Sequence, residues 1–125
     1  MWAPANVRHV IPILRMFDVA ATKRLYLDYL GFTLVHEIGA GDRPVYLILA
    51  LGDVRLHLSS HHGDGTPGTA VLLVTGELDE LHATLAGKGY PFMNPGIEPA
   101  PGGGRELVVL DPASNQLRFY EPGSA

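Results

Sequence analysis

The chain has 125 residues and no cysteine, which excludes two full-sized domains, disulfide bonds, thiolate metal ligands and cysteine nucleophiles. Hydrophobic residues make up 46% of it, which excludes disorder over most of its length, and no apolar run approaches the ~20 residues that a membrane helix needs. The net charge of −4 and the lack of a basic stripe argue against nucleic acid as a partner. The lack of cysteine, of a membrane segment and of an export-signal pattern leads us to expect a cytoplasmic protein that contacts no membrane.

The first half of the chain predicts one strand, one helix and three further strands. Pro12 makes the first strand irregular or an edge strand, because proline lacks a backbone N–H. Asp18 is a suitable N-cap for the helix, and Gly31 can adopt the left-handed turn that ends it. The expected elements are a strand over 9–14, a helix over 19–30, and strands over 32–37, 45–50 and 54–59.

The second half predicts the same order of elements. Gly89 ends its helix and lies 58 residues after Gly31. The long glycine- and proline-rich segment 94–104 is expected as a loop, either a mobile lid over a site or a plain surface connection. The expected elements are a strand over 69–75, a helix that ends at Gly89, a short strand near 90–93, and strands over 105–110 and 116–121.

The repeated order of elements indicates one supersecondary unit used twice. We therefore expect a single domain over residues 1–125, with two βαβββ modules at about 8–60 and 68–122. A linker over 60–68, rich in glycine and proline, joins them. Two such modules can curl their half-sheets around one cavity, and this cavity is where we expect the function.

Several short motifs resemble those of a known superfamily. They are Phe17-Asp18, Leu30-Gly31-Phe32 and Asp111-Pro112, the last followed by 115–119. Together with the repeat they resemble the vicinal oxygen chelate superfamily, and within it the glyoxalase/bleomycin-resistance branch. The resemblance implies an α+β fold in which two βαβββ modules form a curved mixed sheet, with helices outside, a small-molecule ligand inside, and a homodimer. The fold hosts isomerases, dioxygenases, thiol transferases and drug binders, so it does not decide the function.

Enzymes of this superfamily hold a divalent metal ion at fixed strand positions. When the segments of this chain are matched to those of the superfamily, the metal-ligand positions fall on Ile11, Ala70 and Arg118, and on His57 in the fourth strand of the first module. Isoleucine, alanine and arginine offer no lone pair to a cation, so only His57 has the chemistry of a ligand. We therefore expect no metal and no other cofactor.

Two enzymatic alternatives stay open. A metal-dependent glyoxalase- or dioxygenase-like enzyme could use relocated ligands from His9, His57, His61 or His62, with Glu106 as a carboxylate. An enzyme without metal could instead use His57 as a base together with Glu106 or Tyr46. Because His61 and His62 lie in a glycine-rich stretch, they are more typical of exposed polar residues than of rigid metal ligands.

Alternation along the strands predicts which side chains face the cavity. It places Arg55, His57 and Arg118 on the inner face. The candidate ligand-binding residues are Tyr46, Arg55, His57, Gly102, Arg105, Glu106 and Arg118. The alternative reading is that the two arginines of the inner face only pair with Asp53 and Glu106 on a solvated sheet face.

Bleomycin-binding relatives usually carry Pro-Trp-Gly in the loop before an Arg-Glu pair, and the tryptophan stacks on the drug. Here Gly102 stands where that ring would be, while the pair Arg105-Glu106 is retained. The change removes a stacking contact worth about 1 kcal/mol. We expect a metal-free binding protein of bleomycin-resistance type that sequesters a drug-like aromatic or cationic molecule and carries out no catalysis.

Overall fold

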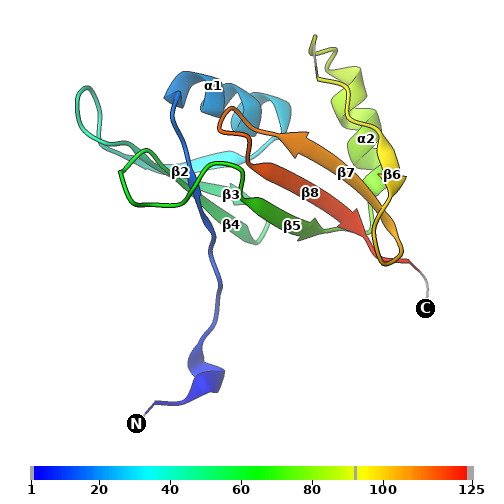
Figure 1. The fold of residues 1–125 in the computed structure, drawn as a ribbon, viewed down its shortest axis with the longest axis horizontal. Helices are drawn as coiled ribbons and strands as arrows, with labels where there is room; N and C mark the ends of the chain where they lie inside the picture. The colour runs from blue at the N-terminus through cyan, green and yellow to red at the C-terminus, as the bar shows by residue number, and fades with distance from the viewer. Residues whose placement is uncertain (1, 92, 124–125) are drawn as a thin grey trace.

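The computed structural model describes residues 2–91 and 93–123, which form two four-stranded sheets with helices packed against them (Figure 1). A turn of 3-10 helix, η1, spans Pro4–Asn6. The other elements of the first module are β1 (Ile13–Arg15), α1 (Val19–Lys23), the π-helix η2 (Arg24–Tyr29), β2 (Thr33–Ile38), β3 (Tyr46–Leu51) and β4 (Val54–Ser59). Those of the second module are β5 (Ala70–Val74), α2 (Leu78–Gly87), β6 (Ile97–Pro99), β7 (Arg105–Leu110) and β8 (Gln116–Glu121).

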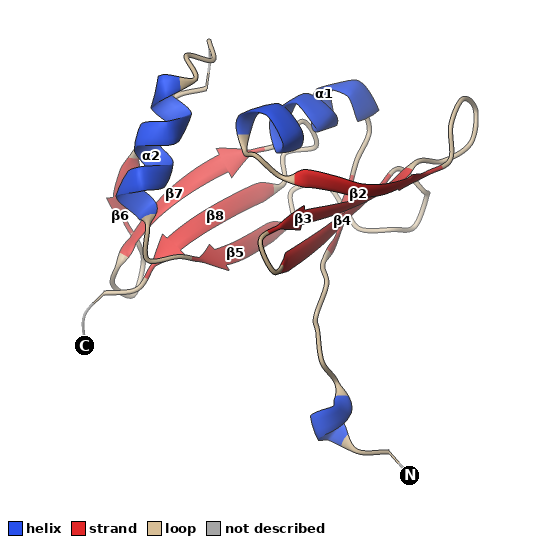
Figure 2. Cartoon of the chain, turned by 180° about the vertical axis from the view of Figure 1, so that it is seen from behind, coloured by secondary structure: helices blue, strands red, loops and turns tan. Residues whose placement is uncertain are grey.

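The two sheets have equivalent topologies. Sheet A has the strand order β1-β4-β3-β2 and sheet B the order β5-β8-β7-β6. In each sheet the first strand runs parallel to the last, and all other neighbours are antiparallel. Figure 2 shows α1 beside sheet A and α2 across the face of sheet B. The predicted α+β fold of repeated βαβββ units is therefore confirmed, with the curved sheet built as two separately hydrogen-bonded halves.

One hydrophobic core extends through both modules. Leucines on alternate strand positions face the helices, as the two-residue period of a strand requires. The buried leucines include Leu14, Leu47, Leu49, Leu56 and Leu58 in the first module and Leu78, Leu85, Leu107 and Leu117 in the second. The opposite, helix-free faces of both sheets carry the half-exposed polar and apolar side chains from which the candidate site is built.

The first strand is shorter than predicted. Only residues 13–15 of the region pair with β4, and the chain before them leaves the body as the N-terminal arm, residues 2–12 (Figures 1 and 2). Pro12 marks the departure: its carbonyl accepts a hydrogen bond from the His57 N–H at 3.0 Å, but proline has no N–H to extend the ladder. Val10 is consequently 90% exposed.

The prediction of a strand near 90–93 is wrong. The chain turns there, with the Met93 N–H donating to the Tyr90 carbonyl, and the Tyr90 ring packs edge-on against Tyr29 with 4.8 Å between ring centroids. The strand that completes sheet B is β6, inside the segment expected to be a loop, where Ile97 pairs with Leu107 of β7. The Tyr29–Tyr90 contact thus lies where a strand was expected.

The first helix begins and ends as predicted but changes type midway. The Asp18 carboxylate accepts a hydrogen bond from the Ala21 N–H at 2.9 Å, as an N-cap should, and Gly31 follows the last turn with a φ of +83°. From η2 onward the helix widens, and the Leu30 N–H donates to the Leu25 carbonyl five residues earlier. Such π-helical turns are rare and occur often at functional sites.

A buried polar hub joins the two modules. The Tyr26 hydroxyl of the first module donates to Asp111 Oδ2 at 2.7 Å, and Asp111 Oδ1 accepts the backbone N–H groups of Ala113 and Asn115 at 2.9 Å. The Asn115 amide nitrogen donates both to Asp111 and to the carbonyl of Arg15 at the end of β1. The β7–β8 turn is thereby fastened to the first helix and the first strand.

This hub makes the stability of the protein sensitive to alkaline pH. Burial, with the Asp111 carboxylate beside it, raises the pKa of Tyr26 well above its usual range. Above pH ~10 the tyrosine ionises in the unfolded chain but stays neutral in the folded one, so the free energy of unfolding falls as pH rises. We expect urea denaturation between pH 9 and 11 to show a steeper loss for the wild type than for Tyr26→Phe. Equal slopes would contradict the assignment.

Candidate functional site

The predicted site residues do not lie together on one surface. Tyr46, Arg55 and His57 come from the helix-free face of sheet A. Glu106 and Arg118 come from the helix-free face of sheet B, where each is the neighbour of a different residue across the β7–β8 ladder. The structure thus forms two pairs of candidate residues rather than one cluster of seven.

On sheet A the structure brings Tyr46 and His57 together. The Tyr46 hydroxyl lies 2.5 Å from His57 Nδ1, and the two rings meet edge to face with centroids 5.1 Å apart. Burial lowers the pKa of His57, and burial together with the charge of Asp64 raises the pKa of Tyr46. We therefore assign a neutral imidazole that accepts the phenol proton on Nδ1 and carries its own proton on Nε2, where it can donate to a ligand.

On sheet B the structure brings Arg118 and Glu106 together. Arg118 Nε lies 3.7 Å from Glu106 Oε2, and among the described residues this nitrogen is buried without a hydrogen-bond partner. The interpretation that Arg118 pairs with Glu106 is therefore realised, although at a distance longer than a hydrogen bond. The Arg118 side chain is 37% exposed, so its guanidinium keeps surface available to a ligand.

Arg55 and Gly102 lie outside these pairs. The Arg55 guanidinium folds back to donate to the Gly52 and Val54 carbonyls, and within residues 2–91 and 93–123 it makes no ion pair with Asp53. Gly102 occupies the turn between β6 and β7 with a φ of +83° and open space on the side where a Cβ would point. An aromatic ring at that position would face solvent in the isolated chain.

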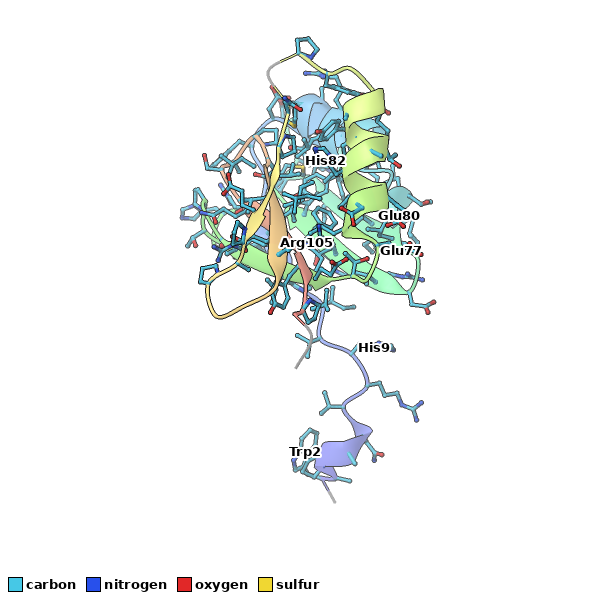
Figure 3. The ribbon with its side chains drawn as sticks, turned by 90° about the vertical axis from the view of Figure 1, so that its right-hand side faces the viewer. Trp2, His9, Glu77, Glu80, His82 and Arg105 are labelled. Atoms are coloured by element: carbon cyan, nitrogen blue, oxygen red, sulfur yellow. The ribbon has the colours of Figure 1, made fainter. Side chains whose placement is uncertain are left out.

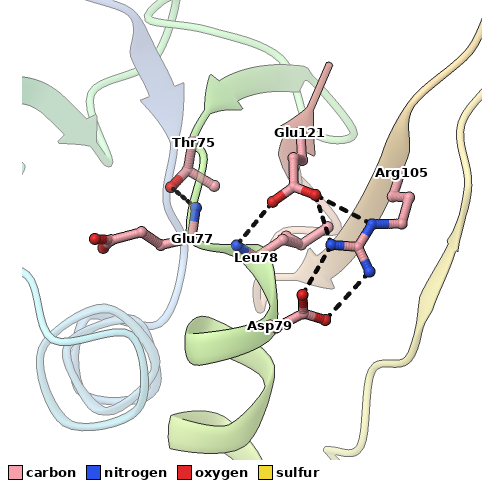
Figure 4. A network of polar contacts seen from close by, with 6 residues as sticks. All are labelled: Thr75, Glu77, Leu78, Asp79, Arg105 and Glu121. Carbon is pink, nitrogen blue, oxygen red and sulfur yellow. Dashed lines mark hydrogen bonds and ion pairs between the residues drawn. The ribbon is translucent and has the colours of Figure 1, made fainter. Parts of the chain in front are cut away.

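Arg105 belongs to the helix side of sheet B. Its guanidinium donates to Asp79 at 3.0 and 3.2 Å and to Glu121, and this pairing lowers the pKa of Asp79 (Figure 4). The Glu121 carboxylate in turn accepts a hydrogen bond from the Leu78 N–H at 3.3 Å, and the Thr75 hydroxyl accepts one from the Glu77 N–H at 3.1 Å (Figure 4). The group of residues therefore caps the first turn of α2. The sequence predicted Arg105 as a ligand-binding residue beside Glu106, but the structure separates the two across the sheet.

A large cavity lies between the two modules, where the repeat led us to expect one, but most of the residues that line it were not predicted. It measures about 710 Å³ and is bounded by the edge of β5, the start of β4, the start of α2 and residues 9–12 of the N-terminal arm. Its walls are mostly apolar and include the exposed Leu72, while Asp53, Glu77 and Glu80 add three carboxylates. Figure 3 shows Glu77, the residue before α2, and Glu80, in its first turn, above the arm.

The residues present do not fit the metal ion of the related enzymes. Three of the four inherited positions carry side chains without a lone pair, and Arg118 at the fourth strand of the second module repels a cation. Within the part of the chain that the structure describes, no three histidine, aspartate or glutamate side chains are grouped as metal ligands. The relocated set is dispersed: His61 points its Nδ1 to the His62 carbonyl in the exposed linker.

The repeated βαβββ unit, with polar side chains on its helix-free faces, is the architecture expected from the resemblance noted in the sequence. The chain belongs to the glyoxalase superfamily, whose family model matches residues 2–124. A bleomycin resistance protein of Geobacillus stearothermophilus is 26% identical over 129 residues, covering 89% of this chain and 94% of that protein. A bleomycin resistance protein of Staphylococcus aureus matches with the same values.

Solved structures give the same relationship. A bleomycin resistance determinant encoded on transposon Tn5 superposes with a TM-score of 0.70 at 25% identity, over 93% of this chain and 98% of that one. The bleomycin-binding protein from bleomycin-producing Streptomyces verticillus, complexed with copper(II)-bleomycin, has a TM-score of 0.66 at 27% identity, over 96% and 98%. Over the residues that the structure describes, no helix is long and apolar enough to cross a membrane.

Proposed function

We propose that this protein binds a small, drug-like aromatic or cationic molecule and sequesters it unchanged, as a protein of bleomycin-resistance type. The observation that carries the proposal is the open cavity of about 710 Å³ between the modules. Its size and its mostly apolar walls with a few polar groups suit an organic ligand. The related bleomycin resistance and bleomycin-binding proteins support the same function.

The charge of the cavity favours a cation. Asp53, Glu77 and Glu80 contribute three carboxylates against the single guanidinium of Arg55, so negative charge is in excess among these groups. The whole chain carries a net charge of −4, which attracts cations at longer range. A ligand with an aromatic body and a cationic end would place the body on the apolar wall and the charge near these acids.

Removing two of the acids is expected to weaken binding of bleomycin, whose terminal amine is cationic. Glu77→Gln combined with Glu80→Gln should raise the Kd at low salt about tenfold, which corresponds to ~1.4 kcal/mol. Asp28→Asn combined with Asp42→Asn changes the net charge equally at exposed sites away from the cavity, and should leave the Kd unchanged. Titration calorimetry gives both values, and mass spectrometry should recover the drug unmodified. A modified drug, or equal Kd values for the two double variants, would contradict the proposal.

We further propose that the protein is a homodimer in which each arm contacts the other copy. The arm projects from the body with Trp2 73% and Val10 90% exposed. Among the described residues, β1 pairs with β4 only at 57–59, and β5 is an edge strand with no partner on its outer side. Such open edges and apolar arms bind other strands readily. Arg8, in the middle of the arm, would also meet the acidic rim of the other copy's cavity.

Cysteine cross-linking tests this arrangement, because the chain has no cysteine of its own. Val10→Cys and Val74→Cys proteins are mixed, unfolded, refolded together and oxidised. We expect a disulfide-linked heterodimer on a non-reducing gel, and none when Asp42→Cys replaces Val74→Cys. A double variant that cross-links only within one chain, together with a monomer mass by ultracentrifugation, would show that the arm folds back on its own body.

We also propose a cytoplasmic location. A chain without cysteine needs no oxidising compartment to fold. Fractionation of producing cells, with immunodetection of the untagged protein in the cytoplasmic and exported fractions, tests it. Recovery in the exported fraction alone would contradict the proposal.

A further inference from the structure

A second cavity lies on the helix side of the molecule and shares no residue with the first. It measures about 360 Å³ and opens between η2, the turn that follows α2 and the β7–β8 turn. Its walls are apolar and aromatic, with Leu25 and Tyr29 on one side and Tyr90, Met93 and Leu110 on the other. This volume lies within the range of small-molecule sites, although none of the seven predicted ligand-binding residues lines this cavity.

One wall residue carries an unused hydrogen-bond donor. The Tyr29 side chain is 1% exposed, and among the described residues its buried hydroxyl has no hydrogen-bond partner. Tyr26, one turn earlier, has its hydroxyl bonded to Asp111 at 2.7 Å, so the same helix does supply partners where they are needed. Burial, with Tyr90 nearby, raises the pKa of Tyr29 and keeps the hydroxyl protonated. A buried donor without an acceptor is unfavourable and calls for an explanation.

The wall around this hydroxyl is fixed on one side and adjustable on the other. The Lys88 ammonium at the end of α2 donates to the carbonyls of Asp28 and Tyr29 at 2.8 and 2.6 Å and holds η2 in place. Tyr90 is 37% exposed, and Met93 is a half-buried, unbranched side chain. Methionine adapts readily to different neighbours, so these two side chains can move to let a ligand reach the Tyr29 hydroxyl.

The two charged residues that line the cavity, Asp111 and Arg24, have opposite signs, so its lining has no net charge to favour an ion of either sign. The Asp111 carboxylate lies in the wall with its oxygens already bonded inside the protein, and it repels an anion. Arg24 at the exposed rim repels a cation. We propose that this cavity is a second ligand site, which takes a small, flat, uncharged molecule and binds its single hydrogen-bond acceptor with the Tyr29 hydroxyl.

A matched pair of probes tests the role of the hydroxyl. Acetophenone and α-methylstyrene have the same shape, but only acetophenone carries a carbonyl acceptor. Titration into ¹⁵N-labelled wild type should give saturable shifts of the Ala21, Leu25 and Leu110 amides, with acetophenone bound about tenfold more tightly. In Tyr29→Phe both probes should bind with the same Kd. No saturable shift at these amides, or a preference for acetophenone that survives Tyr29→Phe, would overturn the proposal.

A second pair of variants tests the location. Ala21→Leu places a larger side chain in the wall of the cavity and should abolish the shifts caused by both probes. Ala86→Leu makes the same change on the exposed face of α2, outside the cavity, and should leave both titrations unchanged. Both substitutions keep a good helix former, so loss of folding does not confuse the result. Unchanged binding in Ala21→Leu would place the probes elsewhere and overturn the proposal.

Discussion

Asp111→Ala is expected to lower the free energy of unfolding by about 3–5 kcal/mol, because it leaves several buried donors without an acceptor. The Asp111 carboxylate is 6% exposed and accepts four hydrogen bonds, from the Tyr26 hydroxyl, the N–H groups of Ala113 and Asn115, and the Asn115 amide nitrogen. Two of the donors are backbone groups that hold the β7–β8 turn. Loss of the carboxylate therefore loosens the turn as well as the contact with the first helix.

Urea denaturation at neutral pH measures this effect, with Asp42→Ala in the exposed loop between β2 and β3 as the control. Asp42→Ala should change stability by less than about 0.5 kcal/mol. Tyr26→Phe removes only one donor and leaves the carboxylate bonded to the turn, so it should cost about 1 kcal/mol. A loss for Asp111→Ala no larger than that for Tyr26→Phe would mean that the turn does not depend on the carboxylate.

The architecture could be predicted from the sequence because local features, such as helix caps and helix-ending glycines, mark the elements of the repeat. Gly31 and Gly89 end their helices with positive φ, and Asp18 caps the first one, each through a requirement of the backbone itself. The shortened first strand and the displaced β6 depend instead on contacts between distant segments. The Tyr29–Tyr90 packing, 61 positions apart in the chain, is not visible in any local pattern.

For the candidate site, strand alternation predicted which face of the sheet a side chain lies on, but not which cavity it lines. Alternation placed His57 and Arg118 on helix-free faces, and the register then set His57 beside Tyr46 and Arg118 beside Glu106. It could not predict most of the walls of the large cavity, since these depend on where the arm leaves the body and on how α2 meets the edge of β5. Nor could it show that the Arg105 guanidinium binds both Glu121 and Asp79, the second of them 26 positions earlier in the chain.

Gly104→Ala is expected to cost about 3 kcal/mol, and Gly102→Ala only about 1–2 kcal/mol. Both glycines have positive φ, +79° and +83°, so an alanine pays the same backbone strain at either position. Their surroundings differ. A Cβ at Gly102 meets open space, whereas a Cβ at Gly104 overlaps the Glu121 carbonyl and comes within 2.9 Å of the Gly123 nitrogen. The difference between the two variants in urea denaturation thus isolates the close approach of the β6–β7 turn to the end of β8.

The overlap between an alanine Cβ at position 104 and the Glu121 carbonyl should also affect the start of α2. Glu121, the residue that the new methyl group displaces, accepts the Leu78 N–H and binds the Arg105 guanidinium (Figure 4). Movement of β8 at this point removes an acceptor from the first turn of a helix, where backbone N–H groups have no partner within the helix. We expect the Leu78 amide to exchange with solvent faster in Gly104→Ala than in Gly102→Ala, beyond what their global stabilities explain. If the Leu78 amide exchanges equally in the two variants once the difference in global stability is taken into account, the turn and the cap are independent.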